Sequence, residues 1–168
     1  MSIIHTQLYH SPCGDLLLEA FDGKLCRCDW TCTARCNSIT DISETPSDLT
    51  QEAVLQLEDY FAGRRTSFGI PLSFVGTDFQ KQVWNALIEI PYGETISYRE
   101  LAVRIGRPEA VRAVAGANHA NVISIFVPCH RVIGSNHSLV GYAGGLPAKQ
   151  YLLDLESLFI VTDKAAHK

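Results

Sequence analysis

Hydrophobic and polar residues alternate along three short segments near the start of the chain. The segments are 5–10, 15–21 and 24–30, and a period of two is typical of strands with one buried face. Asp22-Gly23 separates the second segment from the third and has the composition of a tight hairpin turn. The pattern therefore predicts a three-stranded antiparallel meander.

Helical spacing replaces this alternation after a polar, turn-rich stretch at 37–47, which predicts a loop. Apolar residues recur every three or four positions from 49 to 61, and they predict a helix over about 48–62 that Gly63 ends. Residues 68–75 contain a proline and predict an extended connection. Strands and a helix together indicate a small first domain at 1–75.

From residue 76 onward the pattern is mainly helical. Two capping boxes, at 77–80 and 97–100, predict helices that run to about Ile90 and through Ile105. Further helices are expected at 109–118 and 148–158, with a frayed polar tail at 161–168. The fold class is therefore α+β, with a second, mostly helical domain at 76–168.

Two of the expected helices, 97–105 and 109–118, are joined by a short turn that contains Gly106. This arrangement is either a helix-turn-helix that binds DNA or an ordinary helical hairpin, and the pattern alone leaves both open. The later helix consists mostly of small residues around one long side chain, Arg112. Such a smooth helix suits close contact with a nucleic-acid backbone or a narrow groove.

The β-branched and aromatic run Ile125-Phe126-Val127 predicts a buried strand, which Pro128 ends. The next three residues, at 129–131, are a cysteine, a histidine and an arginine. A thiol at a strand terminus can be held rigidly beside a cleft, which makes Cys129 a candidate nucleophile. A core cysteine beside a surface His-Arg pair would explain the same residues, because free cysteine is often buried.

Composition and charge restrict the class of protein. Apolar residues make up 46% of the 168 residues, which indicates a globular chain, and no apolar run approaches the length that spans a bilayer. The N-terminus lacks the basic and apolar regions of an export signal, so we expect a cytoplasmic protein. The net charge is −4, but residues 76–168 carry nine basic and eight acidic side chains, which is compatible with a modest phosphate-binding surface.

Six cysteines in a reducing cytoplasm are expected to be thiols. Four of them are close in sequence, Cys26, Cys28, Cys32 and Cys36, but their spacing differs from that of the usual paired zinc ligands. We expect no metal site, and the sequence leaves open whether these four cysteines bind anything.

The motif Pro-Cys-His-Arg-Val at 128–132 follows the small-residue helix and precedes Gly-Tyr-Ala-Gly-Gly at 141–145. In this order the motifs resemble those of the O6-alkylguanine-DNA alkyltransferases (methylated-DNA–protein-cysteine methyltransferases), in particular the bacterial constitutive type. The resemblance extends from about Thr77 to Glu156, while the first domain agrees only in the order of its strands and helix. It implies a ribonuclease-H-like N-terminal domain and a helical C-terminal domain that carries the active site.

The same resemblance implies a function in DNA repair. A monomer would bind double-stranded DNA in the minor groove and extrude O6-alkylguanine, or O4-alkylthymine. It would then transfer the alkyl group irreversibly to its own cysteine, with no cofactor.

Residue roles follow from matching positions. The resemblance makes Cys129 the nucleophile and His130 its base through a water molecule, with Glu156 orienting His130. Tyr98 would contact the target nucleotide, and Asn121 would tie the recognition helix to the active-site segment. The matched DNA-contacting positions are Arg112, which would fill the gap left by the extruded base, and Tyr98, Ala113, Gly116 and Arg131. The matched pocket positions are Val132, Tyr142 and Ala143.

The residue types suit such a reaction. Transfer from O6 is a displacement at saturated carbon, for which a thiolate is a strong nucleophile, and a neighbouring base can take the thiol proton. The O6 atom lies inside a stacked duplex, so the base must be extruded, and Tyr98 could protonate the departing guanine. Two alternatives remain open: a cysteine hydrolase that uses Cys129, His130 and Glu156, and a non-catalytic helix-turn-helix protein that binds lesions.

Overall fold

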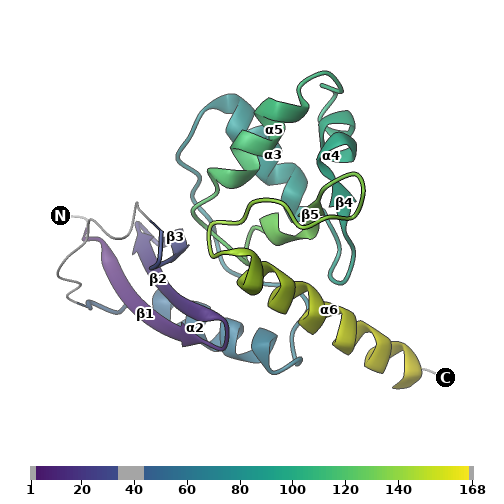
Figure 1. The fold of residues 1–168 in the computed structure, drawn as a ribbon. Coiled ribbons are helices and arrows are strands. Elements are labelled where there is room, and N and C mark those ends of the chain that lie inside the picture. Colours follow the sequence, from purple (N-terminus) through teal and green to yellow (C-terminus); the bar gives the residue numbers. More distant parts are fainter. Residues whose placement is uncertain (1–2, 34–43, 167–168) are drawn as a thin grey trace. The chain divides into compact units, whose positions relative to one another are not determined.

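The computed structural model describes residues 3–33 and 44–166 and contains two compact units (Figure 1). One unit comprises the chain up to Val75 together with Val122–Phe126. The other comprises Gly76–Asn121 and the chain from Val127 onward. A short segment of the second half of the sequence therefore belongs to the first unit.

Three antiparallel strands form the sheet of the first unit, in the order β1-β2-β3 (Figure 1). They are β1 (His5–Ser11), β2 (Gly14–Phe21) and β3 (Lys24–Trp30), which confirms the predicted meander. Asp22 and Gly23 have φ of 53° and 75°, as a two-residue hairpin turn with both central residues left-handed requires. Leu16, Leu17 and Leu18 of β2 are all buried, because β2 is the central strand and both of its faces are covered.

The helix of this unit is α2 (Asp48–Phe61), close to the predicted range. Ser47 and Thr50 form a capping box at its start, and Gly63 has φ of 78° beyond its end. The expected extended connection pairs with the sheet, because Leu25 N donates to Pro71 O at 2.8 Å. The predicted loop at 37–47 lies mostly outside the described residues.

The segment before the Pro-Cys-His-Arg motif differs from the prediction. Ile123 makes a single bridge to Cys28, but residues 125–126 form a turn, so the strand expected at 125–127 is wrong. Ile125 has φ of 73°, an unusual conformation for a β-branched residue. Phe126 packs on Phe68 with 4.6 Å between ring centroids, so the apolar run is buried as a turn rather than as a strand.

The second unit is mainly helical. Its parallel two-residue strands, Ile96–Ser97 (β4) and Val132–Ile133 (β5), pair with each other. Its helices are α3 (Asp78–Ile88), α4 (Tyr98–Arg104), α5 (Val111–His119), the 3-10 turn η1 (Cys129–Arg131) and α6 (Leu146–Ala166). The predicted capping residues Thr77 and Ser97 both accept a backbone N–H at helix starts. Helix α6 continues to Ala166, so the expected frayed tail at 161–168 is wrong for its backbone up to that residue.

Helices α4 and α5 form a helix-turn-helix that packs against α3 (Figure 1). The turn contains Gly106 with φ of 76°. The indole of Trp84 on α3 donates to Ala117 O on α5 at 2.8 Å, while Val114 and Ala117 are buried. One face of α5 is thus fixed against the unit, and the opposite face is exposed.

The cysteine group in the first unit is only partly described. Cys28 is buried, Cys32 is exposed, and Cys26 Sγ donates to Glu19 O at 3.3 Å. Cys36 lies outside the described residues. Within the part of the chain that the structure describes, no three His, Cys, Asp or Glu side chains gather in a way that could hold a metal ion.

No helix among residues 3–33 and 44–166 is both long enough and apolar enough to cross a membrane.

Replacing Thr77 by alanine tests whether the start of α3 depends on its cap. Thr77 Oγ1 accepts from Gln80 N at 3.1 Å, and Gln80 Oε1 accepts from Thr77 N at 3.0 Å. We expect Thr77→Ala to lower the free energy of unfolding by about 1 kcal/mol, measured by denaturant titration with circular dichroism. Thr66→Ala, at an exposed position outside the helices, is the matched control and should change it by less than about 0.5 kcal/mol. Equal effects of the two changes would contradict the role of the cap.

Candidate active site

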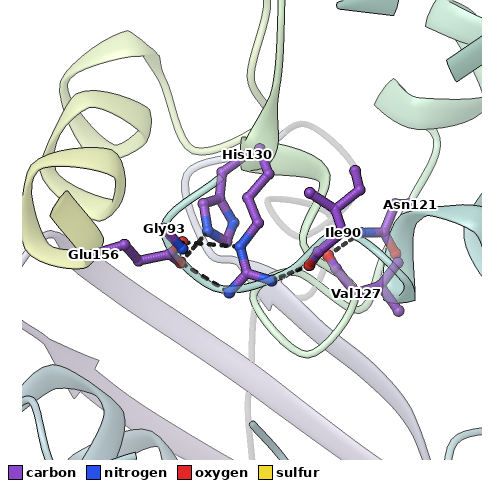
Figure 2. A network of polar contacts seen from close by, with 7 residues as sticks. Ile90, Gly93, Asn121, Val127, His130 and Glu156 are labelled. Carbon is purple, nitrogen blue, oxygen red and sulfur yellow. Dashed lines mark hydrogen bonds and ion pairs between the residues drawn. The ribbon is translucent and has the colours of Figure 1, made fainter. Parts of the chain in front are cut away.

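Cys129 is the first residue of η1 and follows Pro128 directly. Its side chain is almost completely buried, with 4% of the residue exposed. The Asn121 side-chain amide donates to Cys129 Sγ at 3.2 Å and to Val127 O at 3.1 Å, and Figure 2 shows the second of these bonds. An N–H directed at the sulfur interacts more favourably with a thiolate than with a thiol. The structure therefore brings Asn121 and Cys129 together as a thiol with a supporting hydrogen-bond donor.

His130 is fully buried and contacts the carboxylate of Glu156, with 2.6 Å between Nε2 and Oε2 (Figure 2). Burial lowers the pKa of His130, and Arg131 and Lys149 act in the same direction, whereas Glu156 raises it. The ring is therefore neutral near pH 7, and Nε2–H donates to Glu156. The second ring nitrogen, Nδ1, is buried and makes no hydrogen bond to any described residue, so its lone pair can accept a proton.

Glu156 on α6 is the centre of a buried network (Figure 2). Arg131 donates to it twice, from Nε to Oε1 at 2.8 Å and from Nη2 to Oε2 at 3.1 Å, and Gly93 N donates to Oε1 at 3.1 Å. Burial alone would raise the pKa of Glu156. The contacts with His130 and Arg131 outweigh burial and hold that pKa well below its ordinary value. Glu156 is therefore a carboxylate.

Arg131 does not fit the DNA-contacting role implied by the sequence resemblance. Its residue is 6% exposed, and besides Glu156 its guanidinium donates to Ile90 O at 2.7 Å and lies 5.7 Å from the ring centroid of Tyr92. A guanidinium committed in this way cannot also reach a phosphate. Arg131 instead neutralises the buried charge of Glu156.

Tyr98 is the first residue of α4, and its hydroxyl donates to Val140 O at 3.2 Å. Burial raises the pKa of Tyr98, as does the negative charge of a Cys129 thiolate, while a hydrogen bond with the Asn118 side chain lowers it. Tyr98 therefore keeps its proton near pH 7 and lies within electrostatic reach of Cys129.

Lys149, which was not among the residues predicted from the sequence, is fully buried on α6. Its Nζ donates to Val132 O at 2.7 Å and to Val140 O at 3.1 Å, and it lies 5.9 Å from the ring centroid of Tyr98. Burial lowers the pKa of Lys149, whereas a Cys129 thiolate raises it. Sequence spacing could have indicated this position, because Lys149 and Glu156 are seven residues apart and so lie on one helical face.

A small cavity of about 10 Å³ borders Cys129 and has room for about one water molecule. Two of the predicted pocket residues, Tyr142 and Ala143, line it. Val132 does not, although its carbonyl binds Lys149 next to the site. The lining residues are Asn118, His119, Asn121, Cys129, Gly141, Tyr142 and Ala143. Asn118 was missed, although a polar residue beside Val114 and Ala117 on the buried face of α5 is a signal in itself.

The other predicted DNA-contacting positions lie on the exposed face of α5. Arg112, Ala113 and Gly116 are all exposed, and a Cβ placed on Gly116 would meet no atom within 4 Å. Packing within the protein therefore does not require glycine at this position. At these three positions the exposed face of α5 has two small residues and one cationic side chain, that of Arg112.

Comparison with known proteins gives matches over most of the chain. Residues 78–158 match the family described as 6-O-methylguanine DNA methyltransferase, DNA binding domain, and residues 4–74 match the ribonuclease-like domain of the same enzymes. A methylated-DNA–protein-cysteine methyltransferase of Methanosarcina acetivorans is 48% identical over 149 residues, covering 89% of this chain and 96% of the relative. The constitutive methylated-DNA–protein-cysteine methyltransferase of Bacillus subtilis is 45% identical over 154 residues, covering 88% and 92%.

Solved structures agree with this result. The O6-methylguanine methyltransferase of Mycobacterium tuberculosis superposes with a TM-score of 0.83 at 45% identity, covering 93% of this chain and 94% of that one. The M. tuberculosis OGT structure in complex with DNA gives the same TM-score at 44% identity, covering 92% and 94%. The α+β fold, the motifs around Cys129 and these matches together show that the chain belongs to the methylated-DNA–protein-cysteine methyltransferase family.

Proposed function

We propose that this protein repairs DNA by transferring an alkyl group from O6-alkylguanine to Cys129. The observation that carries the proposal is the placement of Cys129 at the border of a cavity, with its Sγ under the amide of Asn121 and with a neutral, buried His130, held by Glu156, next in sequence. The relatives' names give methylated DNA as their substrate, and the M. tuberculosis OGT structure was solved in complex with DNA.

His130 is the base that generates the thiolate. Its Nε2–H is held by Glu156, so Nδ1 accepts the proton of the Cys129 thiol through a bridging water. Sulfur then attacks the alkyl carbon, a C–S bond forms and the bond from carbon to O6 breaks. Lowering of the pKa of His130 by burial keeps the ring in its accepting form at neutral pH.

Tyr98 is the proton donor for the departing guanine. The base leaves as an anion unless it is protonated, and the hydroxyl of Tyr98 carries a proton close to the reacting sulfur. In the structure that hydroxyl is engaged with Val140 O, so it exchanges this partner for the base when substrate is bound.

The exposed face of α5 is the DNA-binding surface. Its small residues let the helix approach the minor groove closely, while Arg112 enters the duplex. Cys129 is 4% exposed and cannot reach a base that stays stacked, so the damaged nucleotide must be extruded. Arg112 offsets part of the unstacking cost by filling the vacated position.

The reaction is irreversible and stoichiometric. Its product is an alkyl thioether, which water does not cleave near neutral pH, so each molecule reacts once and needs no cofactor. O4-alkylthymine is a second, poorer substrate of the same displacement.

The site residues named above lie in the unit that contains 76–121 and 127–168, which supports a catalytic domain at 76–168. We further propose that the protein acts as a monomer. A cytoplasmic location follows from the substrate, since DNA lies in the cytoplasm of bacteria and archaea such as those that contain the relatives.

Methyl transfer to Cys129 is the direct test. Duplex DNA with one O6-methylguanine should add one methyl group to the wild-type protein, located on Cys129 by peptide mass spectrometry. Cys129→Ala should show no transfer while still binding the DNA, and Cys32→Ser, which alters an exposed cysteine in the other unit, should behave as wild type. Transfer to several lesions per protein molecule, or to another cysteine, would refute the mechanism.

The pH dependence of the transfer rate tests the state of His130. Because burial lowers the pKa of His130 below its ordinary 6.5, its accepting form persists below that value. We expect the single-turnover rate to hold as pH falls to 6.5 and to decline only at lower pH. Circular dichroism over the same range checks that the fold persists.

The pH dependence of the transfer rate should also be measured for the Glu156→Gln variant and compared with that of the wild type. Glu156 raises the pKa of His130, so removing its charge should move the decline in rate to still lower pH. The maximum rate should fall about 100-fold, because an NH₂ group replaces an oxygen that accepts from His130 or Arg131. A decline that moves to higher pH would contradict the arrangement.

Substitutions on the exposed face of α5 should separate effects on DNA binding and base extrusion from effects on the methyl-transfer reaction itself. Gly116→Leu should weaken binding to duplex DNA about tenfold or more, measured by fluorescence anisotropy, because the added side chain blocks close approach without disturbing the protein. Arg112→Ala should slow transfer from duplex DNA but leave transfer from the free base O6-methylguanine unchanged. Arg104→Ala, at an exposed arginine of α4 that pairs with Glu100, is the control and should have a smaller effect. Loss of free-base transfer in Arg112→Ala would contradict this assignment.

A further inference from the structure

We infer that Ile125 is a positioning residue for the proposed reaction, because a strained turn at Ile125 holds the backbone that presents Cys129 to its hydrogen-bond partners. This inference rests on the proposed function, since it concerns the rate at which Cys129 accepts the alkyl group. It comes from an unusual backbone conformation four residues before the thiol.

The residues Ser124, Ile125 and Phe126 form a γ-turn. Phe126 N donates to Ser124 O at 2.9 Å, and Ile125 between them has φ of 73°. This form of the γ-turn is rare, and positive φ is unfavourable for a β-branched residue because its Cβ crowds the backbone. Such a conformation persists only where the surrounding structure holds it.

Contacts within the first unit hold the turn on both sides. Cys28 O on β3 accepts from Ser124 N at 2.8 Å, directly before the turn. The side chain of Ile125 is buried, and the ring of Phe126 packs on Phe68 with 4.6 Å between centroids. The turn is therefore fixed by the strand before it and by an aromatic contact after it.

A second unfavourable feature lies beside the turn. Ser124 Oγ is buried and makes no hydrogen bond to any described residue, although buried hydroxyl groups normally have a partner. Alanine at position 124 and glycine at position 125 would remove both costs. Conformational strain that packing maintains is found mainly at functional sites, and this segment leads directly to Cys129.

The turn acts on Cys129 through one backbone oxygen, Val127 O. This oxygen accepts from Asn121 Nδ2 at 3.1 Å and from Cys129 N at 2.8 Å. The same Asn121 amide donates to Cys129 Sγ at 3.2 Å. If Ile125 relaxed to negative φ, the peptides that follow would rotate and Val127 O would leave both donors. The strained turn thus keeps the donor and the thiol together.

The test compares glycine with alanine at position 125. Both variants lack the isoleucine side chain, but only glycine adopts positive φ without steric cost. We expect Ile125→Gly to react with O6-methylguanine duplex about fivefold or more faster than Ile125→Ala, under single-turnover conditions with saturating DNA. Ile125→Val keeps a buried, branched side chain and should react at close to the wild-type rate.

Ile123 provides the matched control. It is a buried isoleucine of the same segment, but it pairs with Cys28 in an extended bridge. At this position glycine should react no faster than alanine, because alanine is the more favourable residue where φ is negative.

Two further readouts separate positioning from stability. The amplitude of methyl incorporation counts the folded molecules, whereas the rate constant reports how Cys129 is presented and does not depend on the folded fraction. Affinity for duplex DNA, measured by fluorescence anisotropy, should stay the same in the variants at position 125, because the exposed face of α5 is unaltered.

Other outcomes overturn the inference. A rate constant of Ile125→Gly equal to or below that of Ile125→Ala would assign Ile125 a packing role, as would differences confined to the amplitude. A preference for glycine at position 123 as well would remove the link to the turn. Absence of methyl transfer by the wild-type protein would refute the proposed function itself, which is a different result from a changed order of variants.

Discussion

A buried carboxylate, that of Glu156, is the constraint on which the active site depends. An ionised carboxylate in a protein interior is strongly unfavourable unless it is paired and hydrogen-bonded, and here it accepts from His130, from Arg131 twice and from Gly93 N. These donors come from η1 and from the connection between α3 and β4, while Glu156 itself is on α6 (Figure 2). The same contacts therefore connect the elements of the unit and orient His130, the proposed catalytic base. Removal of one partner would leave the others as uncompensated buried groups.

The division of roles within this network explains how a histidine can be both buried and basic. Arg131 forms an ion pair with Glu156 and neutralises its charge. Protonation of His130 is therefore not needed to compensate the buried carboxylate. Burial and the nearby cations Arg131 and Lys149 keep the imidazole neutral, and the carboxylate fixes which nitrogen carries the hydrogen. The other ring nitrogen, Nδ1, is then unprotonated and can accept a proton. An isolated His–Glu pair of the same geometry would favour a charged imidazole, which cannot act as a base.

The sequence predicted those features that depend on local interactions. The meander, the capping residues Thr77 and Ser97 and the small-residue helix all follow from neighbours a few positions apart, and the structure has them. Prediction from the sequence failed where contacts between distant segments determine the local conformation. Ile125 is in a turn although its residue type favours a strand, because the chain leaves the edge of β3 at this point.

The partners of the buried polar groups were likewise not visible in the sequence. Arg131 looked like a surface cation because its partners, Ile90 O and Glu156, are 41 and 25 residues away in the chain. Lys149 and Asn118 bind backbone carbonyls, which every residue has, so their helical faces could indicate burial but no motif indicates their partners. The resemblance to a family named the candidate reactive residues, whereas the side chains that set their charge and orientation required coordinates.

In the proposed reaction Cys129 is used only once, and the small size of the cavity bears on how selectively it can react. A thiol with a neighbouring base is exposed to any small electrophile or oxidant that reaches it, and each such event would consume one molecule. About one water molecule fits beside Cys129, so a purine can enter only if part of the lining moves, and one part of that lining is the segment with Gly141 and Tyr142. This segment is held at Val140 O, which accepts from both Tyr98 and Lys149. Gly141 and Gly145 have φ of 48° and 92°, so backbone freedom is available on either side of the residues that must move. Entry of the base therefore competes with the hydrogen bond that occupies the hydroxyl of Tyr98. In the proposed mechanism, opening of the pocket and release of the proton donor would therefore be coupled through Val140 O, which accepts from Tyr98 in this structure.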